Sequence, residues 1–329
     1  MLIGVAGAVG AAAVVSRRRA STSETVPYQD QAALFAAPRL EPEIIPVVSA
    51  DGAELHVRAY GSPDADPIVL SHGWTCSADF WNPQVNALAE KYRVITYDQR
   101  GHGRSGIGST PLSPDVLADD LAAVVGATVR DGRKAEIVGH SMGGMSVVAW
   151  ARKYPEQVDR YAHSVLLAST GTDSLVAETT VVPLPQRFPR LPVPVGRAVL
   201  GSAMPMPASR VTTRAIKYIA MAPGSTPAEV DFCGRIVSEC HPRTRGGWGA
   251  ALSTLDITDG LKNLRVPTTV MVGTADRLTP PSHARRLAQL LDDADNLERL
   301  IVLRDIGHMT SVEAVADFNA EVERLRRLN

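Results

Sequence analysis

The feature that most constrains the fold is an alternation of short apolar runs with segments of helical periodicity. Eight runs have the composition of strands, at residues 44–48, 54–60, 68–71, 92–97, 135–138, 164–168, 268–272 and 300–303. Helical-period segments such as Asp115–Val129 and Met142–Lys153 separate the later ones. Because parallel strands need crossover helices, we expect a mostly parallel eight-stranded sheet flanked by helices. The first two runs flank Asp51-Gly52 and predict an antiparallel hairpin.

The alternation stops between Thr170 and Leu261. Seven prolines fall between Pro183 and Pro207, and helical-period segments follow at Arg210–Ala220 and Pro227–Cys240. Proline has no amide hydrogen to donate within a sheet, so this stretch cannot supply central strands. We therefore expect residues 170–261 to form a mainly helical cap, inserted into an α/β core of residues 44–169 and 262–329.

The first fifteen residues, MLIGVAGAVGAAAVV, are uncharged, and Arg17-Arg18-Arg19 follow them. A helix of that length spans about 23 Å, which is shorter than the roughly 30 Å hydrocarbon core. Positive charge after the apolar stretch differs from a secretory signal and favours a cytoplasmic carboxyl-terminal side. Two interpretations of residues 1–20 stay open: a membrane anchor through residues 1–15, or a leader without regular structure. Residues 21–43 are predicted to be a linker, and the protein is expected in the cytoplasm or on the cytoplasmic face of the membrane.

Composition excludes some classes of partner. The formal net charge is −1 and aromatic residues make up 5% of the chain, so a nucleic-acid surface is not expected. The three cysteines form no C-x-x-C pair, and no His/Cys cluster has the spacing of zinc ligands. We expect no metal and no cofactor.

The pentapeptide Gly139-His140-Ser141-Met142-Gly143 follows an apolar run and precedes a helical pattern. That order of strand, sharp turn and helix is what a nucleophile elbow requires, with the serine hydroxyl exposed above the sheet. Ser141 is therefore the candidate nucleophile.

A serine hydroxyl needs a base, and the base needs an orienting carboxylate. Asp276 follows the strand-like run at 268–272, and His308 follows the run at 300–303. Because the carboxyl ends of parallel strands share one edge of a sheet, we expect Ser141, Asp276 and His308 to meet there. Asp173, which follows the run at 164–168, remains the alternative acid.

The oxyanion hole is predicted from backbone amides. Ser71-His72-Gly73-Trp74 follows the third run, and the amides of Trp74 and Met142 are the expected donors. The glycine-rich segment Tyr97–Ser105, YDQRGHGRS, has two interpretations: a phosphate-binding loop, or a tight polar turn beneath the site, which we favour.

Together, the motifs HGW, YDQRGHGRS, GHSMGG, GTADRLTPP and GHM, in this order, resemble the α/β-hydrolase superfamily, specifically its serine esterase and lipase-like branch with a cap. The resemblance covers about Ile44 to Leu328. Dehalogenase and epoxide-hydrolase relatives carry Asp at the elbow, so the chain with Ser141 does not resemble them in mechanism. The resemblance implies support from His72, Gly73, Gly139, His140 and Gly143 around the three candidate catalytic residues.

The expected activity is hydrolysis of a carboxylic ester, through an acyl-enzyme on Ser141. The substrate would be a small-molecule ester, with lipid-like esters among the candidates. Hydrolysis of a C–C, thioester or amide bond, cofactor-free perhydrolysis, and a non-catalytic binding protein on the same fold stay as alternatives.

Overall fold

The computed structural model describes residues 33–130, 132–180, 198, 201–203 and 209–328. Its strands are β1 (Glu43–Val48), β2 (Glu54–Tyr60), β3 (Pro67–Ser71), β4 (Arg93–Tyr97), β5 (Ala135–His140), β6 (Ala162–Ala168), β7 (Thr268–Gly273) and β8 (Leu297–Leu303). Its helices within the sheet domain are η1 (Ala78–Trp81), α2 (Asn82–Leu88), α3 (Pro114–Thr128), α4 (Met142–Lys153), α5 (Pro155–Tyr161), η2 (Thr258–Asn263), α11 (Pro281–Asp292), α12 (Thr310–Glu313) and α13 (Val315–Arg326). The segment between β6 and β7 contributes α6 (Leu175–Glu178), α8 (Arg210–Ala220), α9 (Pro227–Glu239) and α10 (Pro242–Leu252).

The eight strands form one sheet in the order β1-β2-β4-β3-β5-β6-β7-β8. Strands from β4 to β8 in this order pair in parallel, whereas β1 with β2 and β2 with β4 pair antiparallel. The predicted mostly parallel, eight-stranded sheet flanked by helices is therefore confirmed. The β1–β2 hairpin turns at Gly52, whose φ of 85° requires the left-handed region that glycine tolerates.

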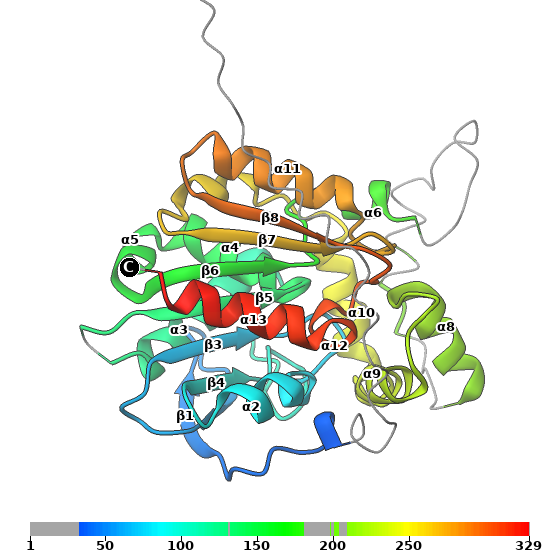
Figure 1. The fold of residues 1–329 in the computed structure, drawn as a ribbon, viewed down its shortest axis with the longest axis horizontal. Helices are drawn as coiled ribbons and strands as arrows, with labels where there is room; N and C mark the ends of the chain where they lie inside the picture. Colours follow the sequence, from blue (N-terminus) through cyan, green and yellow to red (C-terminus); the bar gives the residue numbers. More distant parts are fainter. Residues whose placement is uncertain (1–32, 131, 181–197, 199–200, 204–208, 329) are drawn as a thin grey trace, which may run out of the picture.

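Both faces of the sheet are buried, and alternate residues of each central strand face opposite sides. Val69, Ile137 and Val270 belong to a core that includes residues of α3, α4 and α11. Their neighbours Leu70 and Val138 belong to a second core that includes residues of α2 and α13. Figure 1 shows α2, α12 and α13 in front of the sheet and α3, α4 and α5 behind it. A sheet covered on both sides needs the nearly continuous apolar strands that the sequence contains.

Helices α6, α8, α9 and α10 between β6 and β7, together here called the insertion, lie beyond the carboxyl ends of the parallel strands (Figure 1). Helix α10 is fixed to the loop after β4, because Trp248 donates its indole N–H to the Arg100 carbonyl at 2.9 Å. The Thr244 hydroxyl donates to the Gly101 carbonyl at 2.8 Å. Both predicted helical segments of the insertion are helices. The seven prolines between Pro183 and Pro207 lie outside the described residues.

Helix α10 was not predicted from the sequence, because it contains three glycines that lower helix propensity. One of them, Gly246, packs so closely that a Cβ would lie 2.7 Å from the Gly201 carbonyl oxygen. Tertiary packing therefore specifies this helix.

Part of the segment predicted to be a linker is packed against the protein. Phe35 is buried and stacks on Phe232 of α9, with ring centroids 4.9 Å apart. Asn86 of α2 donates to the Ala36 carbonyl at 3.1 Å. Residues 33–36 thus connect the insertion to the sheet domain.

The leader of residues 1–20 lies outside the described residues, so the structure does not bear on the anchor prediction. Within the described ranges, none of the helices has the length and apolar character needed to span a bilayer.

Candidate active site

Ser141 occupies a strained turn between β5 and α4. It is the single residue between the end of the strand at His140 and the start of the helix at Met142. Its φ of 53° and ψ of −117° are rarely adopted by a residue with a Cβ. Such strain persists where the surrounding structure enforces it, and it is common at functional sites. The residue is partly exposed, as the predicted nucleophile must be.

Close packing around the turn explains the neighbouring glycines. A Cβ on Gly143 would overlap the backbone of Ser71, and one on Gly139 would lie 2.5 Å from the Gly143 carbonyl oxygen. The Ser141 amide donates to the Ala168 carbonyl at 2.9 Å, and its own carbonyl accepts from the Thr170 hydroxyl at 2.7 Å. The turn is therefore held by β3 and by the end of β6.

Asp276 and His308 are directly paired in the loops that follow β7 and β8. His308 Nδ1 lies 2.9 Å from Oδ2 and 3.0 Å from Oδ1 of Asp276. Both side chains are almost completely buried. The two loops are also joined by their backbones, because Ala275 N–H donates to the Ile306 carbonyl at 2.9 Å. This geometry suits a carboxylate that accepts the Nδ1 proton and leaves Nε2 as the basic nitrogen.

Asp276 is stabilised as a carboxylate by its own loop. Its Oδ1 accepts from the amides of Leu278 at 3.0 Å and Thr279 at 2.9 Å, and its Oδ2 accepts from the Thr279 hydroxyl at 2.9 Å. Burial by itself raises the pKa of Asp276, but His308 and these donors outweigh burial and lower that pKa below its usual range. Thr279 was not singled out from the sequence as part of the site, although it lies in the GTADRLTPP motif.

The alternative acid, Asp173, has a different partner. Its Oδ1 accepts from the Arg286 guanidinium at 2.6 Å, and the same guanidinium binds Glu178 at 2.7 Å. This cluster joins the loop after β6 to α6 and α11. The geometry therefore pairs His308 with Asp276, and places Asp173 in an ion pair at the start of the insertion.

His140 connects the serine turn to the loop that carries His308. Its Nε2–H donates to the carbonyl of His308 at 2.8 Å. Burial, followed by the neighbouring His308, lowers the pKa of His140 to about 3. His140 is therefore neutral at physiological pH, which agrees with one ring nitrogen donating and the other unprotonated.

The predicted oxyanion loop lies against the serine turn. A Cβ on Gly73 would lie 3.2 Å from the Ser141 Cβ. Within the described chain, no acceptor is recorded for the backbone amides of Trp74 and Met142. The Trp74 indole donates to the Arg245 carbonyl of α10 at 3.0 Å, so the insertion orients this residue.

His72 fixes the conformation of the same loop. Its Nδ1–H donates to the Gly73 carbonyl at 2.8 Å, and its Nε2 accepts from the Gln99 amide at 2.9 Å. Burial lowers the pKa of His72 to about 4, so the ring is neutral and holds this tautomer. Through these two hydrogen bonds, His72 stabilises the conformation of the loop.

The segment after β4 is structural, as favoured from the sequence. Asp98 accepts from the amides of Ala78 at 2.7 Å and Arg104 at 3.1 Å. Arg100 is buried in ion pairs with Asp51 and Asp120, each at 2.6 Å. Its charge is thereby neutralised, so Arg100 does not offer a free cation for phosphate.

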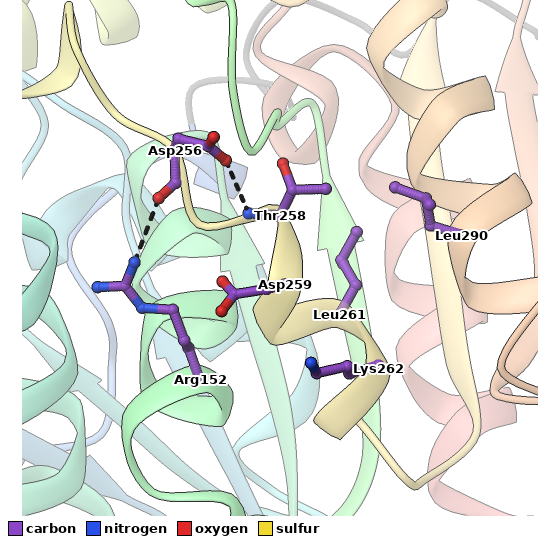
Figure 2. Close-up of a pocket in the computed structure, with 7 residues that line it drawn as sticks. All are labelled: Arg152, Asp256, Thr258, Asp259, Leu261, Lys262 and Leu290. Carbon is purple, nitrogen blue, oxygen red and sulfur yellow. Dashed lines mark hydrogen bonds between the residues drawn. The ribbon is translucent and has the colours of Figure 1, made fainter.

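A cavity of about 630 Å³ lies away from these residues, near the far end of α4. Figure 2 shows its lining, in which Arg152 donates to the Asp256 carbonyl at 3.2 Å. Arg152 and Ser141 are separated by most of α4, or about 16 Å at 1.5 Å per residue. This surface hollow is therefore not where Ser141 would meet a substrate. In the described part of the chain, no group of His, Cys, Asp and Glu side chains is arranged to hold a metal ion.

Comparisons with known proteins agree with this architecture. A family model described as the alpha/beta hydrolase fold matches residues 66–315. A non-heme chloroperoxidase of Streptomyces lividans is 34% identical over 75% of this chain and 88% of its own length. A bifunctional esterase/perhydrolase of Acinetobacter calcoaceticus is 30% identical over 71% of this chain and 83% of its own. The solved structure of a thermophilic esterase from Thermogutta terrifontis superimposes with a TM-score of 0.68 at 22% identity, covering 87% of this chain and 98% of that one.

Proposed function

Because the chain belongs to the alpha/beta hydrolase fold family, we propose that it is a serine hydrolase acting on carboxylic esters. The observation that carries the proposal is the pairing of His308 Nδ1 with Asp276 at 2.9 Å. The same His308 is joined through its carbonyl to the residue that precedes the strained Ser141. A binding protein would need neither the strain nor the buried pair.

In the proposed mechanism, Ser141 Oγ attacks the ester carbonyl while His308 Nε2 takes the hydroxyl proton. Asp276 holds the Nδ1–H and stabilises the imidazolium. The Trp74 and Met142 amides donate to the oxygen that gains negative charge, and each such donor contributes about 3 kcal/mol in serine hydrolases. His308 then protonates the departing alcohol, and water releases the acid from Ser141.

Ser141→Ala tests this assignment directly. The variant should lose on the order of 10⁴-fold or more in hydrolysis of activated esters and should not react with a fluorophosphonate. Circular dichroism should match that of the wild type, because alanine removes only the hydroxyl. A variant that keeps a tenth of wild-type turnover would transfer the chemistry to another residue.

Perhydrolysis is the second candidate, and the Acinetobacter relative described as a bifunctional esterase/perhydrolase favours it. Here hydrogen peroxide replaces water at the acyl-enzyme, so that the acyl group leaves Ser141 as a peracid. Both activities would use one serine. An assay of peracid formation from acetate ester and peroxide, with Ser141→Ala as the control, separates perhydrolysis from a non-enzymatic reaction.

We also propose that the insertion is a cap that selects the ester. Its contacts with the loops after β3 and β4 support this role, through Trp74 with Arg245 and through Trp248 with Arg100. A panel of esters of graded acyl length, compared between wild type and insertion variants, would test it. Selectivity that does not change with the insertion would argue against a cap.

A further inference from the structure

Glu313, at the end of the short helix that follows His308, accepts four hydrogen bonds with one carboxylate. Its Oε2 accepts from the Ala222 amide at 2.7 Å, the Ser225 hydroxyl at 2.7 Å and the Gly307 amide at 3.2 Å. Its Oε1 accepts from the Met309 amide at 3.0 Å. Two of these donors flank His308, and the other two belong to the turn between α8 and α9. One side chain therefore joins the loop of the base to the insertion.

Other contacts bring the same two segments together. The His308 amide donates to the Ala220 carbonyl at 2.9 Å. Gly307 packs directly on the turn, where a Cβ would lie 2.5 Å from the Ala222 nitrogen. The backbone amides of residues 307 and 309 thus both donate to Glu313. The amide between them, that of His308, donates to the Ala220 carbonyl. His140 binds the carbonyl of His308 in addition.

We propose that Glu313 is a positioning residue that sets the orientation of His308 and makes it depend on the placement of the insertion. This inference rests on the proposed serine hydrolase function. Hydrogen bonds to an ionised acceptor are shorter and stronger than neutral ones, so the carboxylate defines the path of the loop. A displacement of about 1 Å at a reacting group can cost on the order of 100-fold in rate. The insertion would then influence turnover as well as substrate selection.

Glu313→Gln removes the negative charge and leaves the size of the side chain almost unchanged. The amide keeps one oxygen, and its NH₂ group must face either the Met309 amide or the three donors at Oε2. At least one of the four hydrogen bonds is therefore lost, and the ionised acceptor is lost in every case. We expect kcat to fall about tenfold while KM stays within twofold, because Glu313 is bonded to the loop of His308 and would act through that loop.

Glu323→Gln is the matched control. Glu323 lies on α13 and pairs with Lys91 at 3.0 Å on the surface. The same chemical change there should leave kcat and KM unaltered. A result in which Glu313→Gln shows wild-type kcat, with a wild-type rate of fluorophosphonate labelling, would overturn the positioning role.

Ser225→Ala keeps the inference testable if Glu313→Gln fails to fold. It removes only one donor from the insertion side and leaves the bonds from Gly307 and Met309 in place. We expect a fall in kcat of about threefold at unchanged KM. An unchanged kcat in a folded Ser225→Ala variant would contradict the proposal.

Measuring Ser141→Ala in parallel separates the two levels of inference. If Ser141→Ala retains activity, the serine hydrolase mechanism is wrong, and Glu313 has no base to position. If Ser141→Ala is inactive while the Glu313 and Ser225 variants turn over at the wild-type rate, only the positioning role is wrong.

Discussion

The orientation of Asp276 gives a prediction of known direction and size for Asp276→Asn. Both loop amides, from Leu278 and Thr279, donate to Oδ1, whereas the Thr279 hydroxyl donates to Oδ2. The asparagine oxygen should therefore remain at Oδ1, where two donors meet it, and place its NH₂ group at Oδ2. That group would lie about as far from His308 Nδ1 as Oδ2 does now, 2.9 Å.

The consequence is a change in the histidine tautomer. An amide N–H facing Nδ1 favours an unprotonated Nδ1, so the ring proton moves to Nε2, which then cannot accept the serine proton. The negative charge that stabilises the imidazolium is lost as well. Such a change in a serine triad costs about 10⁴-fold in kcat, or about 5.4 kcal/mol at 1.36 kcal/mol per factor of ten. We expect a loss of that order for hydrolysis of a chromogenic butyrate ester.

Asp173→Asn is the comparison that makes the measurement decisive. Asp173 pairs with Arg286 in a partly exposed cluster, so its replacement should cost at most about 1 kcal/mol of stability and change kcat less than threefold. Circular dichroism should report the same fold for both variants. If Asp276→Asn stays within tenfold of wild type while Asp173→Asn loses a thousandfold, the acid is Asp173 and the reasoning from geometry is refuted.

Two further predictions concern stability and the leader. Glu136 is fully buried on β5 and neither carboxylate oxygen has a described partner, so burial raises its pKa well above 4.5. The folded protein then keeps a proton that the unfolded chain releases above about pH 4.5, and wild type loses stability as pH rises towards the folded pKa. The free energy of unfolding of Glu136→Gln should rise relative to that of wild type by about 1.4 kcal/mol per pH unit across that window. Urea unfolding that shows the same difference in stability between the two proteins at pH 5 and at pH 8 would contradict this. If residues 1–15 are an anchor, deleting Met1–Arg19 should move the protein to the soluble fraction and leave butyrate hydrolysis unchanged. A longer deletion that also removes Phe35 should lower the melting temperature as well, because the stacking of Phe35 on Phe232 is lost.

The fold could be predicted because it depends on patterns that are local in the sequence. Strands β2 and β5 and helix α4 follow directly from apolar runs, helical periodicity and the glycines around Ser141. Helix α10 could not be predicted, since its glycines oppose a helix and its contacts with the loops after β3 and β4 stabilise it. The packing of Phe35 was missed for a related reason: it lies in a short apolar run, residues 32–37, that is too short to show a period.

The positions of Ser141, Asp276 and His308 could be predicted for a topological reason. Each follows a parallel strand, and parallel topology brings such loops to one edge of the sheet. The sequence could not establish which of the two candidate acids pairs with His308, because both follow strands. That choice depends on Thr279 and Arg286, which hold the two carboxylates in different places.

The finer geometry of the site depends on contacts between segments far apart in the chain. His140 binds the carbonyl of a residue 168 positions later, and Glu313 binds the Ala222 amide 91 positions earlier. Neither contact leaves a periodic signal, because each joins one side chain to one backbone group. Together with the pairing to Asp276, these two contacts would set where His308 lies with respect to Ser141. The contact of Glu313 involves the insertion. A substitution in the insertion that moves the turn at residues 220–225 should therefore change kcat even if it lies outside the substrate's reach. Substrate preference and turnover in this chain should then not vary independently.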